Sequence, residues 1–347
     1  MDSFFEKKRI CLSVKLKVFG DYIIFYRFSF TSSLIICIFA AMKLQTQVEI
    51  QSLLRPVTIR SRIAFIGSCF AQHVGAKMRE SGLPALVNPF GVLYNPQSIL
   101  EVFRQDLLSD DLYFEDEDHR WHCWLTDSSF NASSREACKA GLVSARGKLV
   151  EWNPDTLIIT LGTDRYYVRN SAEMVVGNCH KRPQAEFSEQ EMSIEECVKA
   201  LDKVCSLFPR AQVVLTVSPY RYSKYGFHES RLSKATLLLA VDELCRKRPE
   251  QVCYFPAYEI VLDELRDYRF YGPDMLHPSE QAIEYIWERF TEHCLDNEAR
   301  RYLFDFEPIR KALQHRPEDP DSPASQRFRE QTQQKLYDLL SKYQIEL

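Results

Sequence analysis

Four short segments of the chain are apolar at nearly every position. They are RIAFI (62–66), TLIITL (156–161), QVVLTV (212–217) and VCYF (252–255). A strand that faces water on one side alternates apolar and polar residues, so continuous apolar runs are typical of strands covered on both faces of a parallel sheet. The pattern predicts a three-layer α/β/α sandwich around a parallel sheet.

Segments with a helical period separate these strands, as parallel connections require. Phe70, Val74 and Met78 recur at helical spacing after the first strand, and Ser81-Gly82 ends that helix. Further helices are predicted over 96–107, 189–208, 228–247 and 278–296, and a hairpin over 110–125. Because ligands bind at the carboxyl ends of parallel strands, the residues that follow these four strands are expected at one edge of the sheet.

The first 41 residues differ from the rest of the chain. They combine basic residues with an uncharged run from Phe28 to Met42, which has the length of a signal-peptide core and is short for a bilayer span. Three explanations stay open: a signal peptide cut near Ala41, an N-terminal anchor, or upstream sequence translated from a mis-called start. The third is favoured because MKLQTQVEI, from Met42, resembles an ordinary protein start. We therefore expect a cytoplasmic protein, an exported one if the segment is a true signal, and membrane attachment only if it is an anchor.

The sequence thus divides into an extension (1–41), a principal domain (42–297) and a C-terminal segment (298–347). The last part holds a linker rich in Pro, Asp and Ser (316–325) and a polar helix (326–344) with a thin apolar stripe. This helix is expected to pack on the domain or on a partner.

Composition narrows the function classes. A net charge of −4 gives no support for nucleic-acid binding. Eleven cysteines without a CxxC pair are typical of reduced thiols in a chain large enough to build a core. His119, His122 and Cys123 have near metal-ligand spacing, but no second pair completes a site, so no metal is expected.

The stretch FIGSCFAQHVG (65–75) has the pattern of a nucleophile turn between a strand and a helix. Gly67 permits the sharp bend. The next residues lie at a helix N-terminus, where free N–H groups and the helix dipole favour a thiolate or an oxyanion. Ser68 and Cys69 are both candidate nucleophiles, and a tight structural turn is the alternative interpretation.

A second candidate group precedes the last predicted helix of the domain. In YGPDMLHPSEQ (271–281), Asp274 and His277 stand three residues apart. A loop can hold a carboxylate and an imidazole together at that spacing, with His277 as general base and Asp274 as the group that orients it.

The nucleophile turn and the Asp-x-x-His pair, in this order, resemble the SGNH, or GDSL-like, hydrolase superfamily. More closely, the chain resembles the GSCFA family, which carries the string GSCFA (67–71). Further strings of that kind are NPFGVLYNP (88–96), TLGT (160–163), VVGNCHK (175–181), TVSPYR (216–221), HESRLSKATLLLAVDEL (228–244) and FPAYEIVLDELRDYRFYGPDMLHPS (255–279). The resemblance covers roughly 43 to 297. It implies a flavodoxin-like SGNH fold and hydrolysis or transfer of an acyl group on an ester, with a small molecule or an acylated carbohydrate as substrate and no cofactor.

The resemblance also implies roles for individual residues. The superfamily pattern places Asp after the turn glycine and the nucleophilic Ser next, so anchoring on Gly67 favours Cys69, whereas a one-residue slip gives Ser68. Gly91 matches the first oxyanion donor. Gly162-Thr163 stands where Gly-x-Asn is expected, so either Thr163 or Asn178 would supply the second donor.

Alternatives to catalysis remain. His228, beside the basic and tyrosine-rich RYSKYGF (221–227), could contact a substrate carboxylate or sugar, or simply lie in a solvated helix start. The fold could also serve as a catalytically inactive module that binds a glycan or an acylated ligand. A third option is a structural protein that assembles through the helix at 326–344.

Overall fold

Five parallel strands form the central sheet of the computed structural model, which describes residues 45–345. They are β1 (Ile63–Gly67), β2 (Ala85–Val87), β5 (Thr156–Leu161), β9 (Gln212–Val217) and β10 (Val252–Tyr254). Their spatial order is β10-β9-β5-β1-β2, which is the 2-1-3-4-5 order of flavodoxin-like sheets. The predicted fold class is therefore confirmed. Predictions for residues 1–41 lie outside the described residues.

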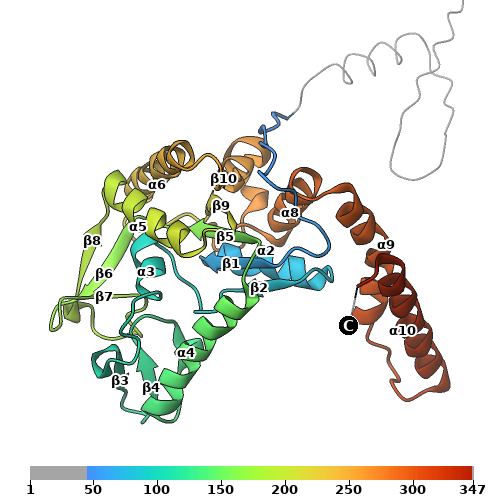
Figure 1. Cartoon of the computed structure of the whole chain (residues 1–347), viewed down its shortest axis with the longest axis horizontal. Helices are drawn as coiled ribbons and strands as arrows, with labels where there is room; N and C mark the ends of the chain where they lie inside the picture. Colours follow the sequence, from blue (N-terminus) through green and yellow to red (C-terminus); the bar gives the residue numbers. More distant parts are fainter. Residues whose placement is uncertain (1–44, 346–347) are drawn as a thin grey trace, which may run out of the picture. The chain divides into compact units, whose positions relative to one another are not determined.

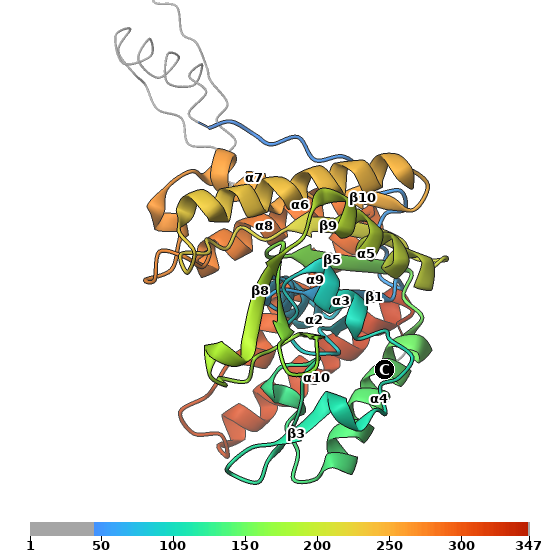
Figure 2. The same cartoon turned by 90° about the vertical axis from the view of Figure 1, so that its left-hand side faces the viewer.

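Successive side chains of each strand point to opposite faces of the sheet, so the sheet contributes to two hydrophobic cores. Ala64 and Ile66 join one buried cluster, whereas Ile63 and Phe65 join the other. The first core is covered by α3 (Pro96–Glu101), α4 (Arg135–Trp152), α5 (Ile194–Leu207) and α6 (Phe227–Lys247). The second is covered by α2 (Cys69–Glu80), α8 (Glu280–Cys294) and α9 (Asn297–Gln314). Figure 1 shows α5 and α6 on one side of the strands and α2 and α8 on the other, and Figure 2 shows β10, β9, β5 and β1 following one another across the sheet.

Four predicted strands are found, and β2 was missed. Its three residues are only half-buried at the edge of the sheet, and so short a run carries little periodic signal. The predicted hairpin is present as β3 (Tyr113–Glu115) and β4 (Trp121–Cys123). An antiparallel sheet of β6 (Arg165–Arg169), β7 (Met174–Val176) and β8 (Phe187–Glu191) was not foreseen.

Two predicted helix boundaries are wrong. The helix expected over 189–208 begins only at Ile194, because Ser193 and Glu196 form a capping box and the residues before it pair as β8. The helix expected over 96–107 ends at Glu101, after which Arg104 and Asp106 pair locally within a turn. Short helical turns lie at Asp110–Leu112, Ser128–Phe130, Gln184–Glu186, Ala257–Glu259 (α7), Ile260–Leu265 and Tyr268–Phe270.

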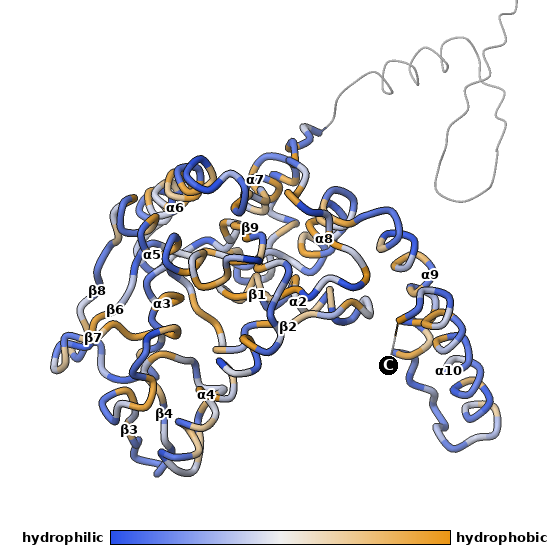
Figure 3. Tube along the Cα trace, in the orientation of Figure 1, coloured by the Kyte–Doolittle hydropathy of each residue, from blue (hydrophilic) through white to orange (hydrophobic). Residues whose placement is uncertain are grey.

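The C-terminal helix packs within the same unit as the sheet. It runs over Pro323–Tyr343 (α10), contacts α9, and contributes Leu339 and Tyr343 to the core that α2 and α8 cover. Most of its residues have the colour of hydrophilic residues in Figure 3. Among the described helices, none is both long enough and apolar enough to cross a bilayer.

Candidate functional site

The turn between β1 and α2 is built around Gly67. Its φ is +141°, and a Cβ there would lie 2.2 Å from the carbonyl oxygen of Thr160, so only glycine fits. Ser68 is the extended N-cap residue, with φ −67° and ψ 173°, and its N–H donates to the Thr160 carbonyl at 3.1 Å. Helix α2 then begins at Cys69. The strand–turn–helix arrangement predicted here is therefore present, at the switch point between β1 and β5 where ligands bind in such sheets.

The two neighbouring candidates for nucleophile lie in different environments. Ser68 is 1% exposed, and its buried Oγ has no hydrogen-bond partner. Cys69 is partly exposed and carries a free thiol. Burial raises the pKa of the Cys69 thiol, while the N–H groups of Cys69 and Phe70 and the charge of Lys234 act to lower it. Of the two side chains, only Cys69 can be reached from solvent.

Asp274 and His277 form a hydrogen-bonded pair in the loop before α8. Asp274 Oδ2 lies 2.5 Å from His277 Nδ1, and Oδ1 accepts from the N–H groups of Leu276 and His277 at 2.9 and 3.0 Å. The hydrogen bond with His277 lowers the pKa of Asp274 to about 2. The carboxylate thus fixes the imidazole through Nδ1, and its Nε2 makes no hydrogen bond to any described residue. The imidazole is about half-exposed.

The loop after β9 holds this pair in place. The N–H of Arg221 donates to the Leu276 carbonyl at 3.1 Å, and its guanidinium donates to the Met275 carbonyl at 2.9 Å. The ring of Tyr220 packs against His277 with centroids 4.4 Å apart. The residues after β9 therefore lie against the loop at 274–277.

Tyr220 also lies within electrostatic range of the nucleophile turn. Burial raises the pKa of Tyr220, and the charges of Asp274 and Cys69 act in the same direction. Among the described residues, no hydrogen bond joins Cys69 to His277. Tyr220 thus packs against His277 and also lies within electrostatic range of Cys69.

The predicted oxyanion donors are already engaged in other contacts. The N–H of Gly91 donates to the Asn88 carbonyl at 2.9 Å, and the N–H of Thr163 donates to the Tyr94 carbonyl at 3.1 Å. Asn178 Oδ1 accepts from the N–H of His180 at 2.7 Å. His228 lies exposed in the first turn of α6. The segment containing Gly91 nevertheless supports the turn, because Asn88 Oδ1 accepts from the N–H of Gly67 at 3.0 Å.

Sequence reasoning missed Lys234, a buried lysine beside the site. It is 2% exposed, and its Nζ donates to the carbonyls of Gly162 and Ser218 at 2.5 and 2.7 Å, just beyond the ends of β5 and β9. Burial lowers its pKa to about 7. The sequence did indicate its burial, because at helical spacing Lys234 falls on the same face of α6 as the buried Leu237 and Val241.

Tyrosines complete the surroundings of Cys69. Burial raises the pKa of Tyr94 to about 12, and the charge of Cys69 adds to that shift. Tyr222 lies edge-on to Tyr220, with ring centroids 4.7 Å apart, and it stacks on Tyr225 at 5.6 Å. These three rings therefore form one packed cluster, which the tyrosine-rich RYSKYGF segment had indicated only as a loop.

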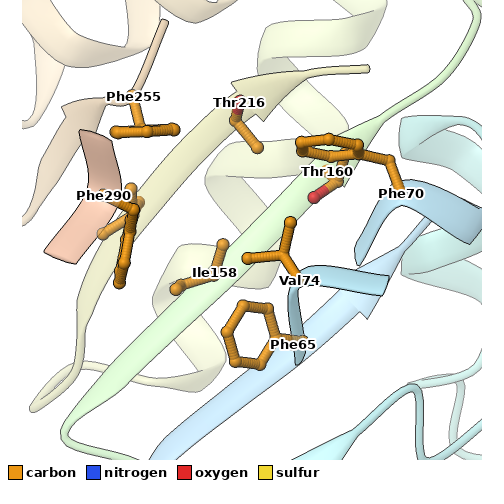
Figure 4. A pocket seen from close by; sticks show the side chains of 9 residues that line it. Phe65, Phe70, Val74, Ile158, Thr160, Thr216, Phe255 and Phe290 are labelled. Atoms are coloured by element: carbon orange, nitrogen blue, oxygen red, sulfur yellow. The ribbon is translucent and has the colours of Figure 1, made fainter. Parts of the chain in front are cut away.

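A separate apolar cavity lies beside the turn, within the core between α2, the sheet and α8. Figure 4 shows Phe70 and Val74 facing the strand residues Phe65 and Ile158, with Phe290 on the far side. Its lining includes neither Cys69 nor His277. This cavity therefore belongs to the packing of the core, and the candidate site is the group around Cys69 at the sheet edge.

Comparisons with known proteins identify two matching families. The GSCFA family matches residues 62–290, and the GSCFA domain protein, C-terminal domain, matches residues 306–346. No curated protein matches the chain.

Several solved structures are similar to the chain at low identity. A mutant of Axe2, an acetyl-xylooligosaccharide esterase from Geobacillus, is 10% identical, with 69% of this chain and 96% of that chain covered and a TM-score of 0.39. A family 3 carbohydrate esterase from Clostridium thermocellum is 12% identical, with 75% and 100% covered and a TM-score of 0.32. The acetyl xylan esterase Est2A from the rumen bacterium Butyrivibrio proteoclasticus is 13% identical, with 71% and 64% covered and a TM-score of 0.36.

Proposed function

The chain belongs to the GSCFA family, and we propose that it is an SGNH-type hydrolase or acyltransferase that acts on an ester through Cys69, His277 and Asp274. The observation that supports this proposal is that one side chain, Tyr220, lies near both candidate groups. A partly exposed thiol lies at the start of α2, and a carboxylate-oriented imidazole lies against Tyr220, whose pKa the charge of that thiol also raises. A thiol, a base and a group that orients the base are the parts that nucleophilic acyl transfer needs.

Cys69 is assigned as nucleophile in preference to Ser68. A nucleophile must reach both its substrate and a base, and the Ser68 hydroxyl is buried without a partner. His277 Nε2 takes the thiol proton as Cys69 Sγ bonds to the acyl carbon. The ester C–O bond then breaks, and the same proton passes to the leaving alcohol. Water, or a second alcohol in the transfer reaction, next attacks the thioester carbon while His277 Nε2 takes its proton. The C–S bond then breaks, the proton passes to Sγ, and the acid or the new ester is released.

The negative oxygen of the tetrahedral intermediate needs fixed donors. The N–H groups of Cys69 and Phe70 at the start of α2 are assigned this role, because both act to lower the pKa of the thiol and so favour negative charge there. Gly91 and Thr163, expected to serve here, donate their backbone N–H groups elsewhere. The buried ammonium of Lys234 adds positive charge beside the thiol.

The direct test is hydrolysis of 4-nitrophenyl acetate by the full chain, combined with mass spectrometry of the trapped acyl-enzyme. We expect turnover by the unmodified protein and by Ser68→Ala, and loss of turnover in Cys69→Ala and His277→Ala. The acetyl group should be found on the peptide containing Cys69. Turnover by Cys69→Ala at the unmodified rate would overturn the assignment.

The second candidate is an inactive module that binds a glycan or an acylated ligand. It is favoured by the missing hydrogen bond between Cys69 and His277 and by burial raising the pKa of the thiol. In that case neither 4-nitrophenyl acetate nor a reactive acyl phosphonate would label Cys69. Labelling of Cys69 that depends on His277 would exclude the module.

A further inference from the structure

A cationic pocket opens beside the candidate catalytic site, at the start of α6. Its lining includes the cations Arg221, Arg231 and Lys234 and the aromatic residues Tyr220, Phe227 and Tyr258. No carboxylate lines it. We call this the α6 pocket.

The cation at the base of the α6 pocket has no counter-charge in direct contact. Lys234 donates to two backbone carbonyls, and among the described residues no Asp or Glu forms an ion pair with it. The charges of Cys69 and Asp164 favour its ammonium form only from a distance, and burial outweighs them, so that the pKa of Lys234 is lowered to about 7. A buried ammonium without an ion-pair partner is costly, and a ligand oxyanion would supply the missing charge.

The two arginines at the α6 pocket are also free of ion pairs with described residues. Arg221 donates to the Met275 carbonyl and lies over the ring of Phe227, 4.4 Å from its centroid. Arg231 is exposed. Arg165, by contrast, pairs with Glu191 at 2.7 Å. Guanidinium groups without an ion-pair partner at a pocket are suited to carboxylate and phosphate.

The α6 pocket adjoins the catalytic groups. Tyr220 lines it and packs against His277, and the charge of Lys234 acts on the Cys69 thiol. We propose that the α6 pocket binds an oxyanion of the ligand, a carboxylate or a phosphate, so that the ester substrate carries a negative charge next to its acyl-bearing part. This substrate class rests on the proposed function, whereas anion binding itself does not.

Direct binding to the full chain tests the proposal without turnover. The probes for calorimetric titration are methyl glucuronoside, glucose 6-phosphate and the neutral methyl glucoside. We expect at least one anionic sugar to bind about tenfold or more tightly than the neutral sugar, which corresponds to 1.4 kcal/mol. Tighter binding of one of the two anionic sugars shows whether the pocket prefers a carboxylate or a phosphate.

Arg231→Gln is the informative variant, because Arg231 is exposed and its removal leaves no ion-pair partner unpaired. We expect it to weaken binding of the anionic sugar about tenfold and Arg231→Lys to weaken it less. The matched control is Arg246→Gln, on the same helix but paired with Asp242 at 2.8 Å, which should bind as the unmodified protein does.

Two results would overturn the α6 pocket proposal: equal binding of the neutral and anionic sugars, or an identical affinity for Arg231→Gln and Arg246→Gln. Its failure is distinguishable from failure of the hydrolase proposal. Anion binding without labelling of Cys69 would keep the pocket and remove the hydrolase. Hydrolysis of a neutral ester without anion binding would do the reverse.

Discussion

The side-chain oxygen of Asn88 accepts a hydrogen bond from the N–H of Gly67 at 3.0 Å, across 21 positions of the chain. Asn88 Nδ2 also donates to Gln72 Oε1 on α2 at 3.3 Å. One buried side chain therefore ties the end of β1 to the helix that carries Cys69. Because the backbone of Asn88 is left-handed, with φ +42°, asparagine suits the position better than most residues.

Asn88→Ala is expected to destabilise the protein and disturb the turn. It leaves the Gly67 N–H unpaired, which costs about 1–3 kcal/mol, and it places alanine in a left-handed conformation that costs roughly 1 kcal/mol more. Asn88→Gly separates the two effects, because glycine accepts the conformation and loses only the hydrogen bond. Urea unfolding measures both. Equal stability of the two variants would contradict the cost of a left-handed alanine. Wild-type stability of Asn88→Gly would contradict the cost of leaving the Gly67 N–H unpaired.

Ser68→Ala and Cys69→Ala should have opposite consequences. The Ser68 hydroxyl is buried and unpartnered, so its removal is expected to leave the free energy of unfolding unchanged or to raise it by up to about 1 kcal/mol. Turnover of the ester should persist. Cys69→Ala should keep the fold and lose turnover. Thermal unfolding and initial rates check the pair, and loss of activity in Ser68→Ala with the fold intact would return the nucleophile role to Ser68.

Asp274→Asn is expected to lower kcat roughly 100-fold with little change in KM, because the imidazole loses the carboxylate that orients it. The pKa of Asp274 is depressed to about 2 by His277. Its contribution is therefore fully present above the ordinary value of 3.8 and is lost only as the pH falls toward 2, so Asp274 should not shape the activity profile at neutral pH. Asp267→Asn is the matched control, since Asp267 pairs with Arg269 in the same exposed loop region. An equal loss of kcat in both variants would mean that the substitutions act by disturbing the loop, and not by removing the carboxylate that orients His277.

The strands and the nucleophile turn could be predicted from the sequence because their signals are local. The apolar runs at 156–161 and 212–217 became β5 and β9 with the predicted bounds. Asp274 and His277 are three residues apart, so their hydrogen bond could also be expected from spacing. The edge strand β2 and the sheet of β6, β7 and β8 depend on pairing between distant segments, which no local period records.

Side-chain partners across the fold could not be predicted from the sequence in the same way. Gly91 and Thr163 were among the expected oxyanion donors, but which carbonyl each backbone N–H meets depends on how two loops pack. The contact of Tyr220 with His277 joins residues 57 positions apart through the ends of separate elements. The position of Lys234 in its helix predicts that the side chain is buried. Only the folded structure shows why an ammonium is tolerated there, because two carbonyls just beyond the strand ends accept its hydrogen bonds.

Lys234 should make the stability of the protein rise with pH above neutrality. Its folded pKa of about 7 lies below its ordinary value of 10.5, so between these values the unfolded chain binds more protons than the folded one. The free energy of unfolding therefore rises with pH through this window, by about 1–2 kcal/mol between pH 7 and 8.5. Burial lowers the pKa of Lys234, and the charges of Cys69 and Asp164 raise it by less. The rings of Tyr222 and Tyr258 face the ammonium.

Lys234→Met tests this dependence, because methionine fills a similar space without a charge. The variant should lack the rise, whereas Lys247→Met, at an exposed position of the same helix, should keep it. Urea unfolding at pH 7.0, 7.75 and 8.5 measures the three curves. The window stays below pH 9 because burial raises the pKa values of thiols such as Cys123 and Cys197, which lowers stability at higher pH. Parallel curves for Lys234→Met and the unmodified protein would mean that Lys234 stays charged in the folded protein, with a counter-charge that its two carbonyl contacts do not provide.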